Sequence, residues 1–332
     1  VDTVYNLDEG IPTPLMDLAG SMETIENLYH EFTEDDLKPQ ELANAVVDGS
    51  DAVGNDTQVG RRVGNRAQLS DKVVNISHAA ESVNTIGSVG RMAYQISRRL
   101  MDLRRSIEGT ICSRQASVVD NGNNVPGRTA GLYAWIKTNT DYGVGGSAGG
   151  FDTATKLIDA PTPGNARALT WEGIRDQIEN IYNKGGNPSV LTSVPGVIKR
   201  INSFLFSDAG APYRASPQAN VNGTSPTSQT AQGYISVVLS DFGISMSLVD
   251  NRLQLVYDSG DSTPVDVADV GLLDPAYFKL ASLFGYRNDE LAKLGHSDRR
   301  LLSTHWMTKV MREDAHGNIA DISPTAAVTA GT

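Results

Sequence analysis

The sequence contains few of the residues that metal or redox chemistry uses. There is one cysteine among 332 residues, Cys112, so the chain forms no internal disulfide and offers no cysteine pair for a zinc site. None of the five histidines has a partner four residues away, the spacing that lets two histidines on one helix bind a metal. No apolar run approaches the ~18–20 residues of a membrane-spanning helix. We therefore predict no metal site, no cofactor, no catalytic residue and no membrane contact.

Positive charge is also scarce. Lysine and arginine number 28 against 39 aspartates and glutamates, which gives a net charge of -11. Such a surface argues against a protein that coats DNA by non-specific attraction. The composition is otherwise that of a folded protein, with 39% hydrophobic and 20% charged residues. The length predicts two domains or one large one.

One catalytic motif has to be weighed. The segment Gly145–Gly149 matches G-x-S-x-G, the hydrolase motif that places a nucleophilic serine, here Ser147, on a turn between a strand and a helix. The residues that follow continue a glycine-rich loop instead of opening a helix. A soluble hydrolase using Ser147 is therefore the third of three functional hypotheses.

The segment 88–117 predicts one long amphipathic helix. Ser88 is its expected N-cap, and about 1.5 Å per residue gives a length of about 40–45 Å. The apolar residues recur every three or four positions and predict a single buried stripe. This stripe consists of Val89, Met92, Ile96, Leu100, Leu103, Ile107 and Ile111.

Arginines are concentrated on the same segment, mainly off the stripe. Two interpretations stay open: a solvated polar face, or a face that meets acidic groups of the same chain, of a neighbouring copy or of a nucleic acid. The six arginines are Arg91, Arg98, Arg99, Arg104, Arg105 and Arg114.

The residues before this helix predict projecting structure. Residues 1–25 are expected to form an extended arm, because Pro12 and Pro14 disfavour regular structure there. Residues 31–83 suggest a long hairpin, with an acidic first arm, a polar glycine-rich tip and a β-branched second arm over 72–83. Such a segment has little to bury by itself and needs a partner surface.

The residues after the helix predict an α+β fold. Thr170 caps a helix that Gly185 and Gly186 end, a strand follows at 188–194, and a second helix follows that. A long polar loop is expected within roughly 205–235, then alternating strands. The last element is predicted as a β-hairpin that turns near His316.

Short motifs along the chain resemble the SU-ten type of phage major head protein, which has the Hong Kong 97-like capsid fold. The resemblance covers roughly residues 85–320 and depends on the order of the motifs. One departure is Gly295-His296, where the family has Gly-Asp. The matching motifs are Tyr94-Gln95 with a basic continuation, Gly185-Gly186-Asn187-Pro188, Asp241-Phe242-Gly243, Asn251-Arg252, Leu273-Asp274-Pro275, Leu291-Ala292-Lys293 and Ala315–Ile319.

The resemblance implies a structural protein that forms hexamers and pentamers of an icosahedral phage head around double-stranded DNA. The alternative is a non-viral, encapsulin-like shell or another virion protein. The implied parts are an N-terminal arm (1–30), an extended hairpin loop (31–85), a spine helix with peripheral domain (86–165), an axial domain (166–272), a peripheral β segment (273–320) and a flexible tail (321–332).

The expected partners are copies of the same chain, weakly held DNA and, in addition, a portal, scaffold or cement protein. The expected location is the virion head, assembled in the bacterial cytoplasm. Lys72 is a candidate for a Lys–Asn cross-link by position alone. The residues predicted to contact neighbouring subunits are Arg61, Arg62, Arg66, Arg98, Arg99, Arg104 and Arg105.

Overall fold

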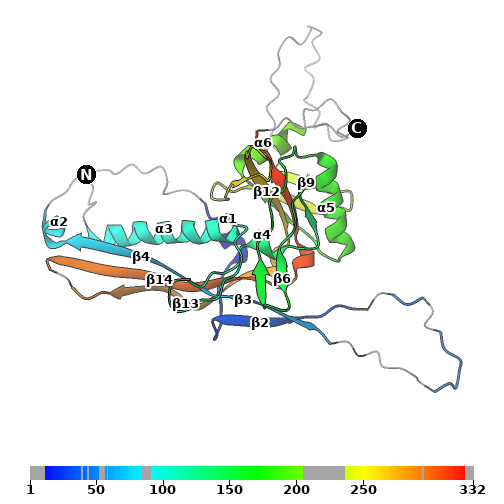
Figure 1. The fold of residues 1–332 in the computed structure, drawn as a ribbon, viewed down its shortest axis with the longest axis horizontal. Helices are drawn as coiled ribbons and strands as arrows, with labels where there is room; N and C mark the ends of the chain where they lie inside the picture. Colours follow the sequence, from blue (N-terminus) through cyan, green and yellow to red (C-terminus); the bar gives the residue numbers. More distant parts are fainter. Residues whose placement is uncertain are drawn as a thin grey trace, which may run out of the picture.

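The molecule is elongated, with three parts that are distinct in Figure 1. A long helix lies on a narrow sheet, an α/β unit stands at one end of that layer, and a hairpin projects beyond it. The computed structural model describes residues 12–325 except 39, 43–44, 52–56, 58, 84–90, 205–235 and 294. The predicted N-terminal residues 1–11 and the polar loop at 205–235 therefore lie outside the described residues.

The narrow sheet has four strands in the order β1-β13-β14-β4. Its long strands are antiparallel to one another, and the short β1 runs parallel to β13. The fourth strand continues into the short helix α2 (His78–Ser82), so the strand predicted over 72–83 ends earlier than expected. The strands are β1 (Glu23–Thr24), β13 (Phe278–Glu290), β14 (Ser297–Val310) and β4 (Gln68–Ser77).

The long helix α3 spans Met92–Ile111 and is shorter than predicted. Arg91 is its N-cap, and the expected cap Ser88 lies outside the described residues. Its 20 residues give a length of about 30 Å at 1.5 Å each. The predicted stripe is confirmed within this span. Leu103, Ile107 and Ile111 are buried, and the earlier stripe residues pack on Val74, Ile76 and Leu302 of the sheet.

The prediction of an irregular arm over residues 1–25 is wrong at Pro14–Ala19, which form the helix α1. Proline stands at the first helical position, where its missing N–H costs nothing. The carboxylate of the buried Glu108 accepts hydrogen bonds from the N–H groups of Leu15 and Met16, both at 2.9 Å. A residue of α3, 92 positions away in sequence, therefore caps this helix.

The α/β unit contains a seven-stranded sheet, ordered β5-β15-β12-β8-β10-β9 with β11 paired to β12. The helices α5 (Trp171–Asn183) and α6 (Pro195–Ser203) pack against it, as predicted, and Thr170 caps α5. The strands are β5 (Thr140–Asp141), β15 (Gly317–Ile322), β12 (Asp266–Leu273), β8 (Val190–Ser193), β10 (Ser245–Asp250), β9 (Val237–Leu239) and β11 (Tyr257–Asp258).

The predicted C-terminal hairpin with a turn near His316 is wrong. The two strands belong to different sheets, because β14 pairs with β13 and β4 whereas β15 pairs with β12 and β5. His316 is fully buried at the start of β15. Asp321 and Ile322, predicted as the start of a flexible tail, are also buried in this strand. Alternation along each strand predicts its faces but not its partner.

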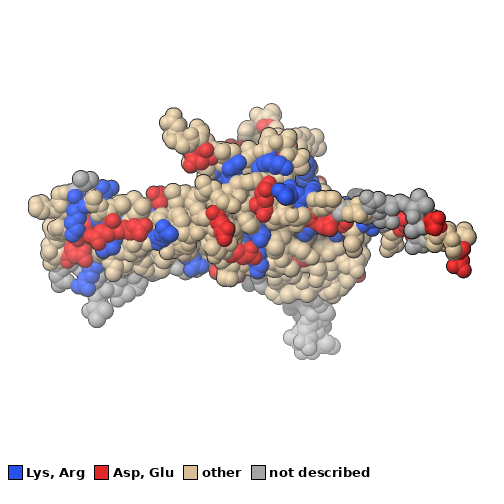
Figure 2. Space-filling model, turned by 90° about the horizontal axis from the view of Figure 1, so that it is seen from below, with Lys and Arg blue, Asp and Glu red and all other residues tan. Residues whose placement is uncertain are grey.

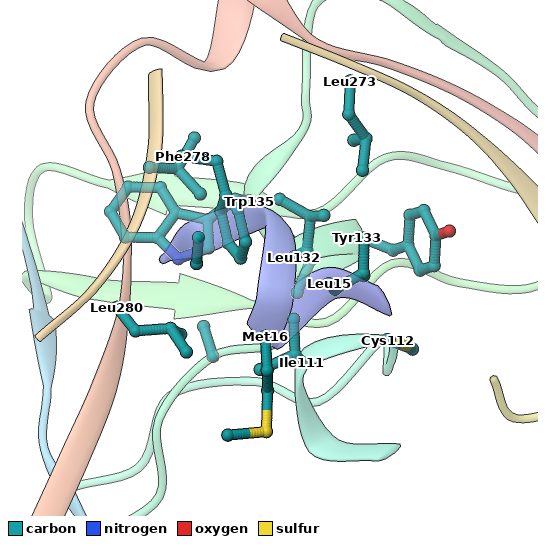
Figure 3. Packing of buried hydrophobic residues seen from close by; sticks show 14 of the residues in the cluster. Leu15, Met16, Ile111, Cys112, Leu132, Tyr133, Trp135, Leu273, Phe278 and Leu280 are labelled. Atoms are coloured by element: carbon teal, nitrogen blue, oxygen red, sulfur yellow. The ribbon is translucent and has the colours of Figure 1, made fainter. Parts of the chain in front are cut away.

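A central core joins the two sheets. Figure 3 shows side chains from α1, α3, α4 and β13 packed together around Leu132 and Trp135. The remaining elements are short and lie near these sheets. They are α4 (Leu132–Trp135), β6 (Gly150–Asp152), β7 (Leu157–Asp159) and the 3-10 turns η3 (Pro275–Tyr277) and η4 (Glu313–Ala315).

Candidate subunit interface

The projecting hairpin is built from β2 (Tyr29–Glu34) and β3 (Arg61–Arg66), paired antiparallel from Tyr29↔Arg66 to Glu34↔Arg61. The hairpin is confirmed, but its second arm is 61–66 and not the predicted 72–83. Residues 72–77 pair with β14 in the four-stranded sheet instead. Beyond the paired strands, residues 35–60 form what we call the hairpin tip.

The described aliphatic side chains of the tip are strongly exposed. Their exposed fractions lie between 78% and 98%. Soluble monomers rarely gather this many exposed aliphatics in one segment unless the segment meets a partner. The residues are Leu37, Leu42, Val46, Val47 and Val59.

The tip is also the most acidic part of the chain. Residues 35–60 contain six carboxylates and one lysine, a net charge of -5 within a total of -11. Figure 2 shows acidic side chains at the far end of the projecting hairpin. An acidic, aliphatic segment is complementary to a surface that is both basic and apolar.

Buried polar contacts fix the hairpin base. Asn65 is fully buried and donates to Oγ1 of Thr129 and of Thr308, both at 2.9 Å. The guanidinium of Arg61 lies 2.7 Å from the carboxylate of Glu34. Burial raises the pKa of Glu34, although the hydrogen bond and charge of Arg61 oppose this. The hairpin therefore leaves the body in a fixed direction.

Of the three arginines predicted for the hairpin, two contact their own chain. Arg61 pairs with Glu34, and Arg66 lies 4.9 Å from the ring centroid of Tyr29. Arg62 is exposed on β3. Arg61 and Arg62 are thus both exposed at the base of the hairpin, and Arg61 is in addition paired with Glu34.

A second candidate surface is the face of the four-stranded sheet turned away from α3. Val74, Ile76 and Leu302 face the helix, so alternate residues of the strands point the other way. The cross-strand pairs Leu69↔His305 and Val73↔Leu301 lie on this face. His305 also pairs with Phe284 of β13, which places Phe284 on the same face. Leu69 is 59% exposed and Val73 46%.

Two arginines accompany these apolar residues. Arg299 pairs in register with Asn75, and the guanidinium of Arg287 lies 4.2 Å from the ring centroid of Phe284. Asp71 of β4 and Asp289, which pairs with Leu301, lie on the same face. The surface therefore combines aliphatic side chains with charges of both signs. We call it the uncovered sheet face and define it by Leu69, Val73, Phe284, Arg287, Arg299 and Leu301.

The predicted arginines of α3 divide into two groups. Arg99 lies 2.6 Å from Asp102 of the same helix, and Arg104 lies 3.6 Å from Asp17 of α1. Part of the basic face thus meets acidic groups of its own chain. Arg98 is exposed and Arg105 half-buried on the side of the helix away from the sheet.

Arg114, by contrast, is no surface residue. It follows α3, is 6% exposed and binds Asp269 of β12 at 2.8 Å and Asp321 of β15 at 3.0 Å. Burial lowers the pKa of Arg114, but the hydrogen bonds and charges of the two aspartates outweigh it and raise the pKa. Sequence reasoning missed this link between the helix and the seven-stranded sheet. Its partners are 155 and 207 residues away and share no motif with it.

The strand-turn-helix arrangement that the hydrolase hypothesis requires around Ser147 is not present. Ser147 is exposed, pairs through its backbone with Thr162, and leads to the strand β6 instead of a helix. Among the described residues, no group of three or more potential ligands could hold a metal ion. Within the same residues, no helix is long and apolar enough to cross a membrane.

Comparison with known proteins decides the family. The family model of the SU10 major capsid protein matches residues 1–323. The chain belongs to the SU10 major capsid protein family. The resemblance that the motifs suggested is thereby confirmed, and as an SU10 family member the protein is a structural capsid protein. No protein with a curated functional description matches it in sequence.

Solved structures show the same fold as this SU10 family member at low sequence identity. The cyanophage A-1(L) capsid protein has a TM-score of 0.57 at 12% identity, covering 97% of this chain and 96% of that one. The capsid protein of a native GTA particle has a TM-score of 0.56 at 11% identity, covering 97% of this chain and 96% of that one. The holo-SrpI encapsulin of Synechococcus elongatus PCC 7942 has a TM-score of 0.55 at 11% identity, covering 100% of this chain and 95% of that one. The predicted Hong Kong 97-like capsid fold is confirmed.

Proposed function

We propose that copies of this SU10 family member form hexamers and pentamers of an icosahedral phage head that encloses double-stranded DNA. The observation that carries this proposal is the projecting hairpin tip. Its aliphatic side chains are exposed, and although its net charge is -5, only Asp36 forms an ion pair with a cation of the body, Arg312, among the described residues. A shell of many copies supplies cover to every tip.

The uncovered sheet face of a neighbouring copy is the surface that fits the tip. Leu69 and Val73 offer apolar contact to the tip aliphatics. Arg287 and Arg299 offer partners for individual tip carboxylates, although Asp71 and Asp289 lie on the same face. Each such contact need only be weak, because every subunit has several neighbours and the contacts act together. Arg61, Arg62 and Arg66 remain proposed contact residues at the hairpin base, and Arg98, Arg99, Arg104 and Arg105 on α3.

Several finer features belong to the same proposal. The protein acts without enzymatic activity, and heads assemble in the bacterial cytoplasm before they become part of the virion. The sequence also predicts that the 1–25 arm reaches another neighbour and that the loop within roughly 205–235 lies near a capsomer axis or at a rim, but residues 1–11 and 205–235 lie outside the described residues. DNA is held weakly, and a portal, scaffold or cement protein can join the shell. Maturation re-docks the projecting elements as rigid bodies.

The test replaces the tip and leaves its base intact. Deleting residues 50–68 would remove Asn65 and its buried contacts, so replacing 40–57 by a glycine-serine linker is the sharper change. Electron microscopy should show closed shells for the natural chain and none for the variant, at unchanged thermal unfolding. The control replaces the exposed loop 121–125 in the same way. Normal shells without the tip would contradict the proposal.

A second candidate function is a non-viral shell. The likeness to the encapsulin of Synechococcus elongatus, with a TM-score of 0.55, favours it as the alternative. The two functions differ in content. Nuclease-resistant DNA in particles from the natural source would support the phage head, and an enclosed protein cargo without DNA would support the compartment.

A further inference from the structure

Three adjacent strands of the seven-stranded sheet place polar side chains against the central core. Thr192 of β8 and Asn318 of β15 are both in register with Gly271 of β12, which lies between them. Residues opposite one another in antiparallel strands share a face, and Val190 and Leu273 on this face belong to the central core. Thr192 and Asn318 are nevertheless fully buried. We call Thr192, Gly271 and Asn318 the buried polar row.

Tyr133 of α4 covers the middle of this row. A Cβ atom built on Gly271 would lie only 2.8 Å from the phenol oxygen of Tyr133, so the hydroxyl sits directly over the glycine. Tyr133 is itself fully buried, and Figure 3 shows its hydroxyl pointing away from Leu132 and Leu15 of the apolar cluster. The absence of a side chain at Gly271 therefore brings a third polar group to the row.

The protein alone does not satisfy these polar groups. The hydroxyls of Thr192 and Tyr133 have no hydrogen-bond partner among the described residues. Burial raises the pKa of the neighbouring Tyr142, and a hydrogen bond with Asn318 opposes this. One hydroxyl can serve only one of the two amide atoms of Asn318, so the other amide atom still needs a partner. Folded proteins pair nearly all of their buried polar groups, which indicates that a further molecule binds here.

Spacing and chemistry identify that molecule. The Cβ positions of residues in register are about 4.5–5.5 Å apart, and two hydrogen bonds of about 2.8 Å that meet at one atom span such a distance. The side chains of Thr192, Tyr133 and Asn318 are neutral, so an ion would find no charged partner in the row. Each of them can both donate and accept hydrogen bonds, and water does the same.

We infer that the buried polar row and Tyr133 bind at least one ordered water molecule, which links α4 to the seven-stranded sheet. Buried waters in proteins typically make about three hydrogen bonds to groups that the protein leaves unsatisfied, and Thr192, Tyr133 and Asn318 provide three such groups. The water belongs to the interior of each subunit. The inference is therefore independent of the proposed function and of how the subunits assemble.

Chemical denaturation of unassembled full-length subunits tests the shared water through T192V, Y133F and the double variant. Valine has nearly the shape of threonine without its hydroxyl. Each single substitution should lower the midpoint of denaturation. The double variant should lose clearly less than the sum of the two, because removing the second hydroxyl costs little once the bridge is broken.

The matched control pairs Y133F with S193A. Ser193, the next residue along β8, is also buried but donates directly to the carbonyl oxygen of Asp269 at 2.8 Å. It shares no water with Tyr133, so the losses of S193A and Y133F should add.

Two results would overturn the inference. One is a rise of the midpoint in both T192V and Y133F, which is expected when an unpaired hydroxyl is removed from a dry interior. The other is a cryo-electron microscopy map of the assembled natural chain that resolves buried waters elsewhere but none within about 3.2 Å of the Thr192 hydroxyl. A water peak between Thr192 and Tyr133 would confirm the site even if a variant failed to fold.

Discussion

The two sides of the α3 layer differ in chemistry although they are only one helix and one sheet apart. The uncovered sheet face combines exposed aliphatic residues, such as Leu69 and Val73, with two arginines. The outer side of α3 alternates arginines with Tyr94 and Met101, of which Met101 is 37% exposed. Leu69 and Val73 give the sheet face the larger exposed aliphatic area. The comparison therefore favours the sheet face as the surface that meets the hairpin tip of a neighbouring copy.

The largest expected effect concerns Arg114, whose ion pairs with Asp269 and Asp321 join the end of α3 to the seven-stranded sheet. Replacing Arg114 by alanine leaves Asp269 and Asp321 buried without their cation. Breaking a buried ion pair from one side costs roughly 3–5 kcal/mol. Chemical denaturation should show this loss for R114A and a change within about 0.5 kcal/mol for R98A on the exposed outer side. Equal stability of the two variants would mean that the link does not support the fold.

His316 and His305 should differ in how much each contributes to the pH dependence of the free energy of unfolding. Burial lowers the pKa of His316 to about 4, whereas the unfolded chain has about 6.5. The unfolded state therefore binds the proton first, and stability falls as pH drops from about 6.5 toward 4. The loss is up to about 3 kcal/mol, at 1.36 kcal/mol per pKa unit.

Burial also lowers the pKa of the less buried His305 on the sheet face. Removing the imidazole of His305 should alter the pH dependence of stability less than removing that of His316. Denaturation of H305Q and H316Q at pH 7 and pH 5 checks this. A steeper pH dependence in H316Q than in the natural chain would contradict it.

A further pair of substitutions separates the covered and the uncovered side of the sheet. Leu302 packs under α3 and is 3% exposed, so L302A should cost about 2–5 kcal/mol. In the unassembled subunit, V73A on the open side should cost within about 0.5 kcal/mol. Denaturation of subunits at low concentration checks both. A large cost for V73A there would show that the subunit itself covers this face.

The sequence predicted the elements that repeat a local pattern. The stripe of α3, the cap at Thr170 and the projecting hairpin all appear in the structure. The partners of the strands were not predictable, since alternation in β14 and β15 is the same whichever sheet each joins. The helix α1 was missed because its cap, Glu108, is distant in sequence. The outward-facing surfaces could be named only after the buried faces were known.

The most direct test places one cysteine on the hairpin tip and one on either side of the layer. The natural Cys112 is fully buried and should not interfere. In assembled particles of L42C/V73C, mild oxidation should give disulfide-linked chains as a ladder on denaturing gels. The matched variant L42C/R98C should give single chains, because Arg98 lies on the outer side of α3. A ladder from L42C/R98C and none from L42C/V73C would contradict the assignment of the two sides.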